Sequence, residues 1–101
     1  MAKKSAVEKN NKRKRIVAAH GARRSALRAI IANKNVSMED RFQAVLKLSK
    51  EPRDSSKIRV RNRCEISGRP RGYDRKLKMS RIAVRDLASL GHVPGVVKSS
   101  W

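Results

Sequence analysis

Arg61-Asn62-Arg63-Cys64-Glu65-Ile66-Ser67-Gly68-Arg69-Pro70-Arg71-Gly72 lies in a last third of the chain that carries twelve Lys or Arg residues, and its glycines and proline indicate a loop. Each arginine offers a planar fork of N–H donors that matches phosphate oxygens and base edges. The glycines let the backbone approach a partner more closely than any residue with a Cβ. This arrangement suits a polyanion better than a protein core, so we expect the function of the chain to lie here.

The charge of the chain points to the same class of partner. It has 27 Lys and Arg against 8 Asp and Glu, a net charge of +19 over 101 residues. The charge is uneven: residues 1–35 carry +10, residues 36–56 carry 0 and residues 57–101 carry +9. A polyanion relieves the self-repulsion of so basic a chain and releases its own counterions on binding. We therefore expect two segments that face RNA or DNA and a neutral middle that faces something else.

Three domains follow from this charge pattern. Residues 1–35 are expected to form a basic helical extension, residues 36–56 a neutral amphipathic helix and linker, and residues 57–101 a compact basic module. Leu, Ile, Val and Phe together make only about a fifth of the chain, so the core must be small. We expect one small unit that is well ordered only on its partner.

The N-terminal third favours helix. Residues 3–33 contain no proline and are rich in Ala, Lys and Arg, which are good helix formers. Gly21 is expected to bend or divide this helix, and Asn10-Asn11 to weaken its start. The run Lys12-Arg13-Lys14-Arg15 spreads charge around almost a full turn, with no large apolar face to offset it. A merely solvated basic helix is the alternative to an RNA-binding one.

The neutral middle predicts an ordinary amphipathic helix over residues 37–50. Ser37 reads as its N-cap and Pro52 closes it. Met38, Phe42, Val45 and Leu46 recur at helical spacing. This stripe is expected to be core, against another helix or a neighbouring protein, rather than a ligand site.

The last third predicts a strand, a loop and a helix. Basic and β-branched residues alternate over residues 57–61, as in a short half-buried strand. After the arginine loop, Ser80 caps a helix that runs to about Leu90, and Gly91 suits the left-handed position that ends it. Ile82, Ala83, Leu87 and Leu90 are expected to line its inner face.

Four positions in this third have the spacing of the ligands in a zinc site, although three of them are not usual ligands. Four cysteines at the positions of Cys64, Ser67, Ser80 and Ala83 would form two knuckles that hold a tetrahedral zinc. Only Cys64 is a ligand, so no metal or other cofactor is expected, and Cys64 is interpreted as a small buried hydrophobe. The module is then a zinc-ribbon-like fold without the metal, held by side chains such as Ile66, Leu77, Met79, Ile82 and Leu87.

Other classes of protein are disfavoured. The two histidines are isolated from any matching acid and thiol, so an enzyme is not expected. The single cysteine excludes an internal disulfide, and no apolar run approaches the roughly 18–20 residues that span a bilayer. The expected location is the cytoplasm.

The motifs of the last third resemble a known family. Arg61-Asn62-Arg63-Cys64, then Ser67-Gly68-Arg69-Pro70-Arg71-Gly72, Arg75, Ser80-Arg81, Arg85 and Ala88, and the ending Gly91–Trp101 resemble the ribosomal protein fourteen family of the bacterial small subunit. Residues 1–56 resemble the N-terminal extension of the long, zinc-free form, a weaker match because basic helices are common. The short form has four zinc-binding cysteines where this chain has Cys64, Ser67, Ser80 and Ala83.

The resemblance implies a structural role in the ribosome. It implies binding to 16S ribosomal RNA in the head of the small (30S) subunit, a need for the chain in subunit assembly, and a part in shaping the RNA near the decoding A site. It implies small-subunit proteins three, ten and nineteen as neighbours, a ribosome-bound location in the cytoplasm, and neither a membrane nor a small-molecule substrate. The RNA-binding residues expected from the motifs and the charge are Lys12, Arg13, Lys14, Arg15, Arg23, Arg24, Arg28, Arg59, Arg61, Asn62, Arg63, Arg69, Arg71, Arg75, Lys76, Arg81, Arg85, Lys98 and Trp101.

The roles of two aromatic residues are left as alternatives, and two rival functions are also considered. Tyr73 is expected to pack in the core or to stack on a base, and Trp101 to contact RNA or a protein neighbour. A histone-like protein that compacts DNA is the main rival, although a non-specific binder needs no defined loop. A membrane-active cationic peptide is the other rival, and its weak apolar face argues against it.

Overall fold

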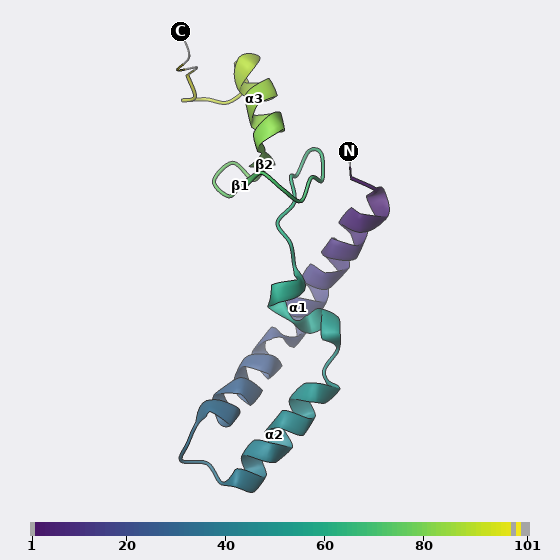
Figure 1. Cartoon of the computed structure of the whole chain (residues 1–101), viewed down its shortest axis with the longest axis vertical. Helices are drawn as coiled ribbons and strands as arrows, with labels where there is room; N and C mark the ends of the chain where they lie inside the picture. The colour runs from purple at the N-terminus through teal and green to yellow at the C-terminus, as the bar shows by residue number, and fades with distance from the viewer. Residues whose placement is uncertain (1, 98, 100–101) are drawn as a thin grey trace. The chain divides into compact units, whose positions relative to one another are not determined.

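The regular elements of the chain are mainly helical (Figure 1), as predicted for this small, irregular fold. The computed structural model describes residues 2–97 and residue 99. The chain divides into two compact units, one formed by Met1–Glu8 with Arg61–Trp101 and the other by Lys9–Val60. In chain order the elements are α1 (Lys4–Ala32), α2 (Met38–Lys50), the short 3-10 helices η1 (Arg53–Ser55) and η2 (Lys57–Arg59), β1 (Tyr73–Asp74), β2 (Met79–Ser80) and α3 (Arg81–Ser89).

The N-terminal segment is one continuous helix, so the predicted division at Gly21 is wrong. Helix α1 runs for 29 residues through both Asn10-Asn11 and Gly21. A glycine in a helix costs only about 1 kcal/mol relative to alanine, and the surrounding Ala, Lys and Arg residues favour helix. Asn10 is not a weak start but a buried residue, with 4% of its surface exposed.

Helix α2 begins as the sequence predicts. The Ser37 hydroxyl accepts a hydrogen bond of 3.3 Å from the backbone N–H of Asp40, which satisfies one of the unpaired donors of the first turn. The residues that turn inward are different from those predicted. Ala44 is the buried residue of α2, whereas Met38 and Phe42 of the apolar stripe are 78% and 62% exposed. The stripe is therefore not core within this chain.

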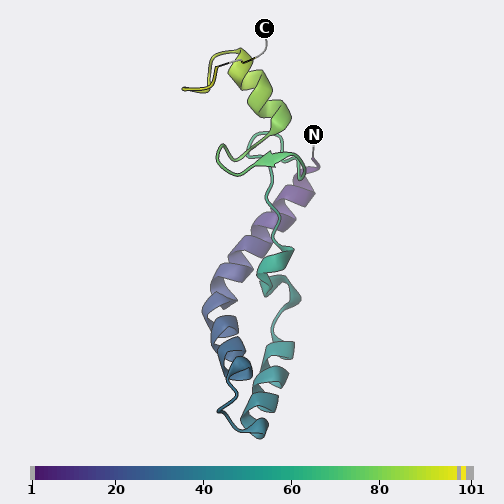
Figure 2. The same ribbon diagram turned by 60° about the vertical axis from the view of Figure 1, so that its left-hand side comes forward.

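In the unit Lys9–Val60, α2 and the two 3-10 helices run back along α1 (Figures 1 and 2). Near the turn, the Arg41 Nε donates a hydrogen bond of 3.1 Å to the carbonyl oxygen of Ile31. Further along, the His20 ring lies 2.7 Å from the Glu51 carboxylate. Polar contacts therefore connect the two sides of this helical hairpin along much of its length.

The strand predicted over residues 57–61 is absent, and Lys57–Arg59 forms the 3-10 helix η2 instead. Its backbone bonds are local, because Arg59 N–H donates to the carbonyl of Ser56 and Val60 N–H donates to that of Lys57. Ile58 is 90% exposed, so the alternation of basic and apolar residues does not mark a buried face. A strand also needs a neighbour for its ladder, and none is formed at this segment.

The other unit holds a short antiparallel hairpin followed by α3. Strands β1 and β2 pair with Tyr73 opposite Ser80 and Asp74 opposite Met79. The Ser80 hydroxyl caps α3 by accepting from Ala83 N–H at 3.3 Å, and Gly91 after the helix has a φ of 73°, both as predicted.

The predicted inner face of α3 is wrong in part. Ala83 and Leu87 are half-buried, but Ile82 and Leu90 are 49% and 68% exposed. Ile66 in the loop is 62% exposed as well, so it does not help to hold the module together as expected. This unit is too small for one helix and a two-residue hairpin to cover every apolar side chain.

Candidate nucleic-acid interface

The arginine loop is shaped by its own backbone. The N–H of Cys64 donates to the carbonyl of Arg69 at 3.0 Å, and the N–H of Gly68 donates to the carbonyl of Cys64 at 2.9 Å. Gly68 has a φ of 70°, a conformation that residues with a Cβ rarely adopt. A Cβ at this position would also lie 2.9 Å from Val7 Cγ2. The glycine is thus required both by the turn and by the close approach of the N-terminal residues.

Two arginines of the motif brace this loop from within. The Arg63 guanidinium donates a hydrogen bond of 2.9 Å to the carbonyl of Gly68, and Arg61 Nε donates one of 3.1 Å to the carbonyl of Pro70. A guanidinium has five N–H donors, so such a bond occupies only part of its capacity. Arg61, Asn62 and Arg71 are exposed, whereas Arg63 and Arg69 are half-buried. The loop therefore presents cations whose positions are set by the fold.

The hairpin tip carries a second group of bases. The Asp74 carboxylate accepts hydrogen bonds from the backbone N–H groups of Lys76 and Leu77, at 2.8 and 3.1 Å, which closes the turn. Arg75 and Lys76 are exposed on this turn. Lys78 is exposed beside them with a φ of 55° and was missing from the residues expected in the sequence. Its place next to Arg75 and Lys76 in the sequence, with Leu77 between, was the signal that could have included it.

Helix α3 adds two exposed arginines one turn apart. Arg81 and Arg85 lie on the same face, since residues four apart are neighbours on a helix. The N–H of Arg81 donates to the carbonyl of Gly72 at 2.7 Å, and a Cβ at Gly72 would lie 3.3 Å from the Arg81 side chain. The helix is therefore tied directly to the end of the arginine loop.

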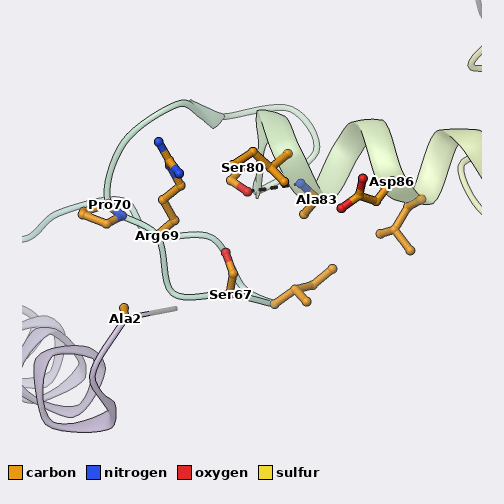
Figure 3. Close-up of a pocket in the computed structure, with 10 residues that line it drawn as sticks. Ala2, Ser67, Arg69, Pro70, Ser80, Ala83 and Asp86 are labelled. Atoms are coloured by element: carbon orange, nitrogen blue, oxygen red, sulfur yellow. Dashed lines mark hydrogen bonds between the residues drawn. The ribbon is translucent and has the colours of Figure 1, made fainter.

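A hollow of about 580 Å³ lies beside these groups (Figure 3). The loop supplies one side, with Ser67 and Arg69, and the start of α3 supplies the other, with Ser80, Ala83 and Asp86. The side-chain Nε of Arg69 is buried with no hydrogen-bond acceptor among the described residues. The lining residues are Ala2, Ile66, Ser67, Arg69, Pro70, Ser80, Ile82, Ala83, Asp86 and Leu87.

The four positions with zinc-like spacing do not form a metal site. Cys64 is buried and is the single cysteine of the chain, and Ser67, Ser80 and Ala83 complete no ligand set. Among the described residues, no group of three His, Cys, Asp or Glu side chains is placed to hold a metal ion. These residues do not fit zinc.

The sulfur of Cys64 nevertheless accepts hydrogen bonds that favour its thiolate form. Burial by itself would raise the pKa of Cys64, but hydrogen bonds from Ser67 and from the backbone of Ser80 and Ile66 lower the pKa to about 6. The Ser67 N–H lies 3.4 Å from the Sγ atom. The backbone around this residue thus favours a negatively charged sulfur even though no metal ligand set is present.

In the unit Lys9–Val60, four of the expected RNA-binding arginines contact the chain itself. Arg13 and Arg59 both bind Asp54, at 3.2 and 2.9 Å. Burial would raise the pKa of Asp54, but the hydrogen bonds and charges of Arg13 and Arg59 lower it below its usual range. Arg23 lies 2.9 Å from Glu51, and Arg24 donates to the Ser55 hydroxyl at 3.0 Å.

The remaining bases of α1 face solvent. Lys12, Lys14, Arg15 and Arg28 are exposed, and none of them forms an ion pair among the residues that the structure describes. Sequence reasoning did not separate these residues from the paired ones, because Glu51 and Asp54 lie about 30 to 40 positions away. Lys98 and Trp101 of the expected set lie outside the described residues.

None of the helices in the described part of the chain has the length and hydrophobicity that crossing a bilayer requires. Tyr73, for which packing and stacking were both expected, is half-buried on β1.

The chain is similar to known proteins over its whole length. The family described as ribosomal protein S14p/S29e matches residues 47–100, which include the arginine loop, the hairpin and α3. The chain is 63% identical to the small ribosomal subunit protein uS14 of Rhizobium meliloti and to that of Sinorhizobium medicae, and 59% identical to that of Brucella ovis. Each of these matches covers 100% of both chains.

Proposed function

Because the chain belongs to the ribosomal protein S14p/S29e family, we propose that it binds 16S ribosomal RNA in the head of the small subunit. The chain is a structural constituent of the small ribosomal subunit and not an enzyme. In the proposed role it is needed for assembly of the subunit and shapes the RNA near the decoding A site.

The arginine loop is the observation that carries this proposal. Its shape is set by the hydrogen bond from Arg63 to the Gly68 carbonyl and by that from Arg61 to the Pro70 carbonyl. Cations that are already positioned lose less conformational entropy when they bind than cations on a mobile tail. Irregular RNA is recognised by shape, stacking and backbone contact, for which a rigid loop of arginines is suited.

The proposed RNA contacts extend to the exposed bases of both units. In the basic C-terminal unit they include Arg71, Arg75, Lys76, Arg81 and Arg85, with Asn62 as a polar contact. On α1 they include Lys12, Lys14, Arg15 and Arg28. Lys98 and Trp101 remain part of the proposal on sequence grounds.

The internally paired arginines are given a double role. Arg13, Arg23, Arg24 and Arg59 each use one or a few donors within the chain. The donors that remain are directed by these pairs and add positive charge next to the exposed bases. Loss of such a residue would therefore affect both the helical hairpin and the affinity for RNA.

Different segments of the chain are proposed to contact RNA and protein. Residues 1–35 and 57–101 contact RNA, and residues 36–56 face a protein neighbour, since their net charge is zero. The neighbours proposed are small-subunit proteins three, ten and nineteen. The protein acts in the cytoplasm, bound to the ribosome, without zinc or a small-molecule substrate.

Sedimentation of a cell lysate tests the proposal directly. The chain should migrate with small subunits and whole ribosomes at about one copy per particle and should stay there through a high-salt wash. A chain that stays at the top of the gradient, or spreads with DNA, would contradict the proposal and favour a nucleic-acid-compacting protein.

A further inference from the structure

We propose that the apolar stripe of α2, formed by Met38, Phe42, Val45 and Leu46, is a docking site for a protein segment that carries an apolar side chain beside lysine or arginine. The inference rests on the proposed function, because the partner is a neighbouring protein of the same ribosomal subunit. It goes beyond that function by naming the surface and the chemistry of the segment that covers it.

The stripe has no cover within the described residues. Met38 and Phe42 are 78% and 62% exposed, and Val45 and Leu46 are 45% and 46% exposed. The inner face of α2 is a different one, in which Ala44 is buried and Leu48 is half-buried. Contiguous apolar side chains of this size are rarely left in water unless they mark an interaction site.

The stripe is hollowed in a way that suits an inserted side chain. A depression of about 400 Å³ lies between α2 and the end of α1, lined by Met38, Phe42, Val45 and Ile31 with Glu39 and Arg41 at its edge. Aromatic and methionine side chains are enriched at the centres of protein interfaces, where an anchor residue fills a pocket on the partner. The depression is therefore large enough and apolar enough for such an anchor.

The local charge favours a protein over RNA as the occupant. The stripe begins in the first turn of α2, where Glu39 and Asp40 are exposed. Neither acid forms an ion pair with a described residue of the chain, whereas Glu51 and Asp54 are each held by two cationic or ring nitrogen groups. The Glu39 carboxylate lines the depression, where it repels phosphates and attracts lysine or arginine, and the Arg41 side chain in the same lining donates to the carbonyl of Ile31. A basic protein segment with an apolar anchor satisfies both features.

Site-specific crosslinking in assembled particles tests the inference. A photoreactive phenylalanine analogue replaces Phe42 in the full chain, and subunits are reconstituted from 16S RNA and purified small-subunit proteins. The matched control carries the analogue at Ile58, an apolar residue that is 90% exposed outside the stripe. The expected result is one major protein crosslink from position 42, to a peptide with lysine or arginine next to an apolar residue, and no such product from position 58.

Two substitutions test the chemistry of the contact. Phe42→Ala removes the anchor site and Glu39→Lys reverses the charge at its edge. Each should weaken the association of the crosslinked partner with subunits that contain the variant, by about 10–30-fold for Phe42→Ala. Ile58→Ala and Glu8→Lys are the controls and should leave it within about twofold. Because Phe42 and Glu39 are exposed, circular dichroism should show unchanged helix content.

The outcomes separate this inference from the proposed function. If the wild-type chain fails to enter particles, the proposed function is wrong. If the chain enters particles but the analogue at position 42 crosslinks to RNA, or to nothing, the docking site is wrong and the ribosomal role stands. Equal losses from Phe42→Ala and Ile58→Ala would also overturn the docking site.

Discussion

The guanidinium of Arg63 donates a hydrogen bond of 2.9 Å to the carbonyl oxygen of Gly68, five positions further along the chain. An arginine that sequence reasoning assigned to RNA binding thus helps to shape the loop that carries its neighbours. The same division appears in the other unit, where Arg13 and Arg59 converge on Asp54. In this very basic chain, part of the arginine content builds the surface that the rest presents.

Gly68→Ala should destabilise the chain more than alanine at any other loop glycine of positive φ with open space around it. The positive φ alone costs roughly 1–2 kcal/mol for a residue with a Cβ, and the new Cβ would lie 2.9 Å from Val7 Cγ2. Denaturant unfolding of the full chain measures the change.

Two other glycines are the controls for that substitution. Gly91 also has a φ of 73°, but no atom lies within 4 Å of a Cβ added there. Gly91→Ala should therefore lose only the free energy that the positive φ costs. Gly21→Ala lies within α1 with open space around it and should stabilise the chain by about 0.5–1 kcal/mol. If Gly68→Ala were no worse than Gly91→Ala, the close approach of Val7 would not contribute.

Asp54→Asn should weaken the helical hairpin at neutral pH, with an effect that shrinks in acid. Arg13 and Arg59 lower the pKa of Asp54, so the folded carboxylate stabilises the chain above the ordinary pKa of about 4. That contribution is lost as the pH falls through the lowered pKa. Thermal unfolding of both proteins at pH 7 and near pH 3 measures it.

Asp86→Asn is the matched control, since Asp86 forms no ion pair among the described residues. Its effect at pH 7 should be clearly smaller than that of Asp54→Asn. Equal effects of the two substitutions would show that the two arginines do not stabilise the hairpin through Asp54.

Cys64→Ser should remove a rise of stability with pH. The pKa of the folded thiol is lowered to about 6, whereas that of an unfolded cysteine is about 8.5. A lowered folded pKa means that the thiolate stabilises the fold fully above about pH 8.5 and that this contribution is lost as the pH falls through 6. The difference in unfolding free energy between wild type and Cys64→Ser, measured under reducing conditions, should therefore grow from pH 6 to pH 8.5. A constant difference would contradict the lowered pKa.

The elements with local signals could be predicted from the sequence. Ser37 and Ser80 mark the starts of α2 and α3, since a cap is a contact across three residues that spacing alone reveals. Gly91 marks the end of α3 for the same reason, because a left-handed residue there favours glycine. These features depend on neighbouring residues only.

Features that depend on distant residues were missed or misread. The ion pair between Arg13 and Asp54 joins positions 41 residues apart, and no pattern in either segment predicts it. Ile58 alternates with bases as a strand residue would, yet it is 90% exposed in a 3-10 helix. The stripe of α2 was identified correctly by its spacing, but which face packs inward depends on what α1 offers, and Ala44 fits there.

Replacing Arg69 and Arg71 by Ala should impair incorporation into small subunits far more than replacing Lys3 and Lys4. The backbone of the loop that carries Arg69 and Arg71 is held by the bonds around Gly68, whereas both lysines are exposed at the start of the chain. A hydrogen bond to a charged group contributes about 1.5–3 kcal/mol, so the loop variant should bind at least about tenfold more weakly. Quantitative mass spectrometry of purified subunits, with both variants in competition with wild type, measures this, and equal losses would count against a positioned loop.

Affinity for RNA should fall steeply with salt, because each neutralised phosphate releases counterions. If about six to ten phosphates are contacted, affinity for folded 16S fragments should drop roughly 10³–10⁵-fold between 50 and 200 mM salt. Arg71→Ala removes one exposed loop cation and should reduce the logarithmic slope by about one. Glu39→Gln, on the proposed protein-facing helix, should leave the slope unchanged. Filter binding across a salt series measures all three proteins, and a flat response of the wild-type chain would rule out phosphate contacts as the main source of affinity.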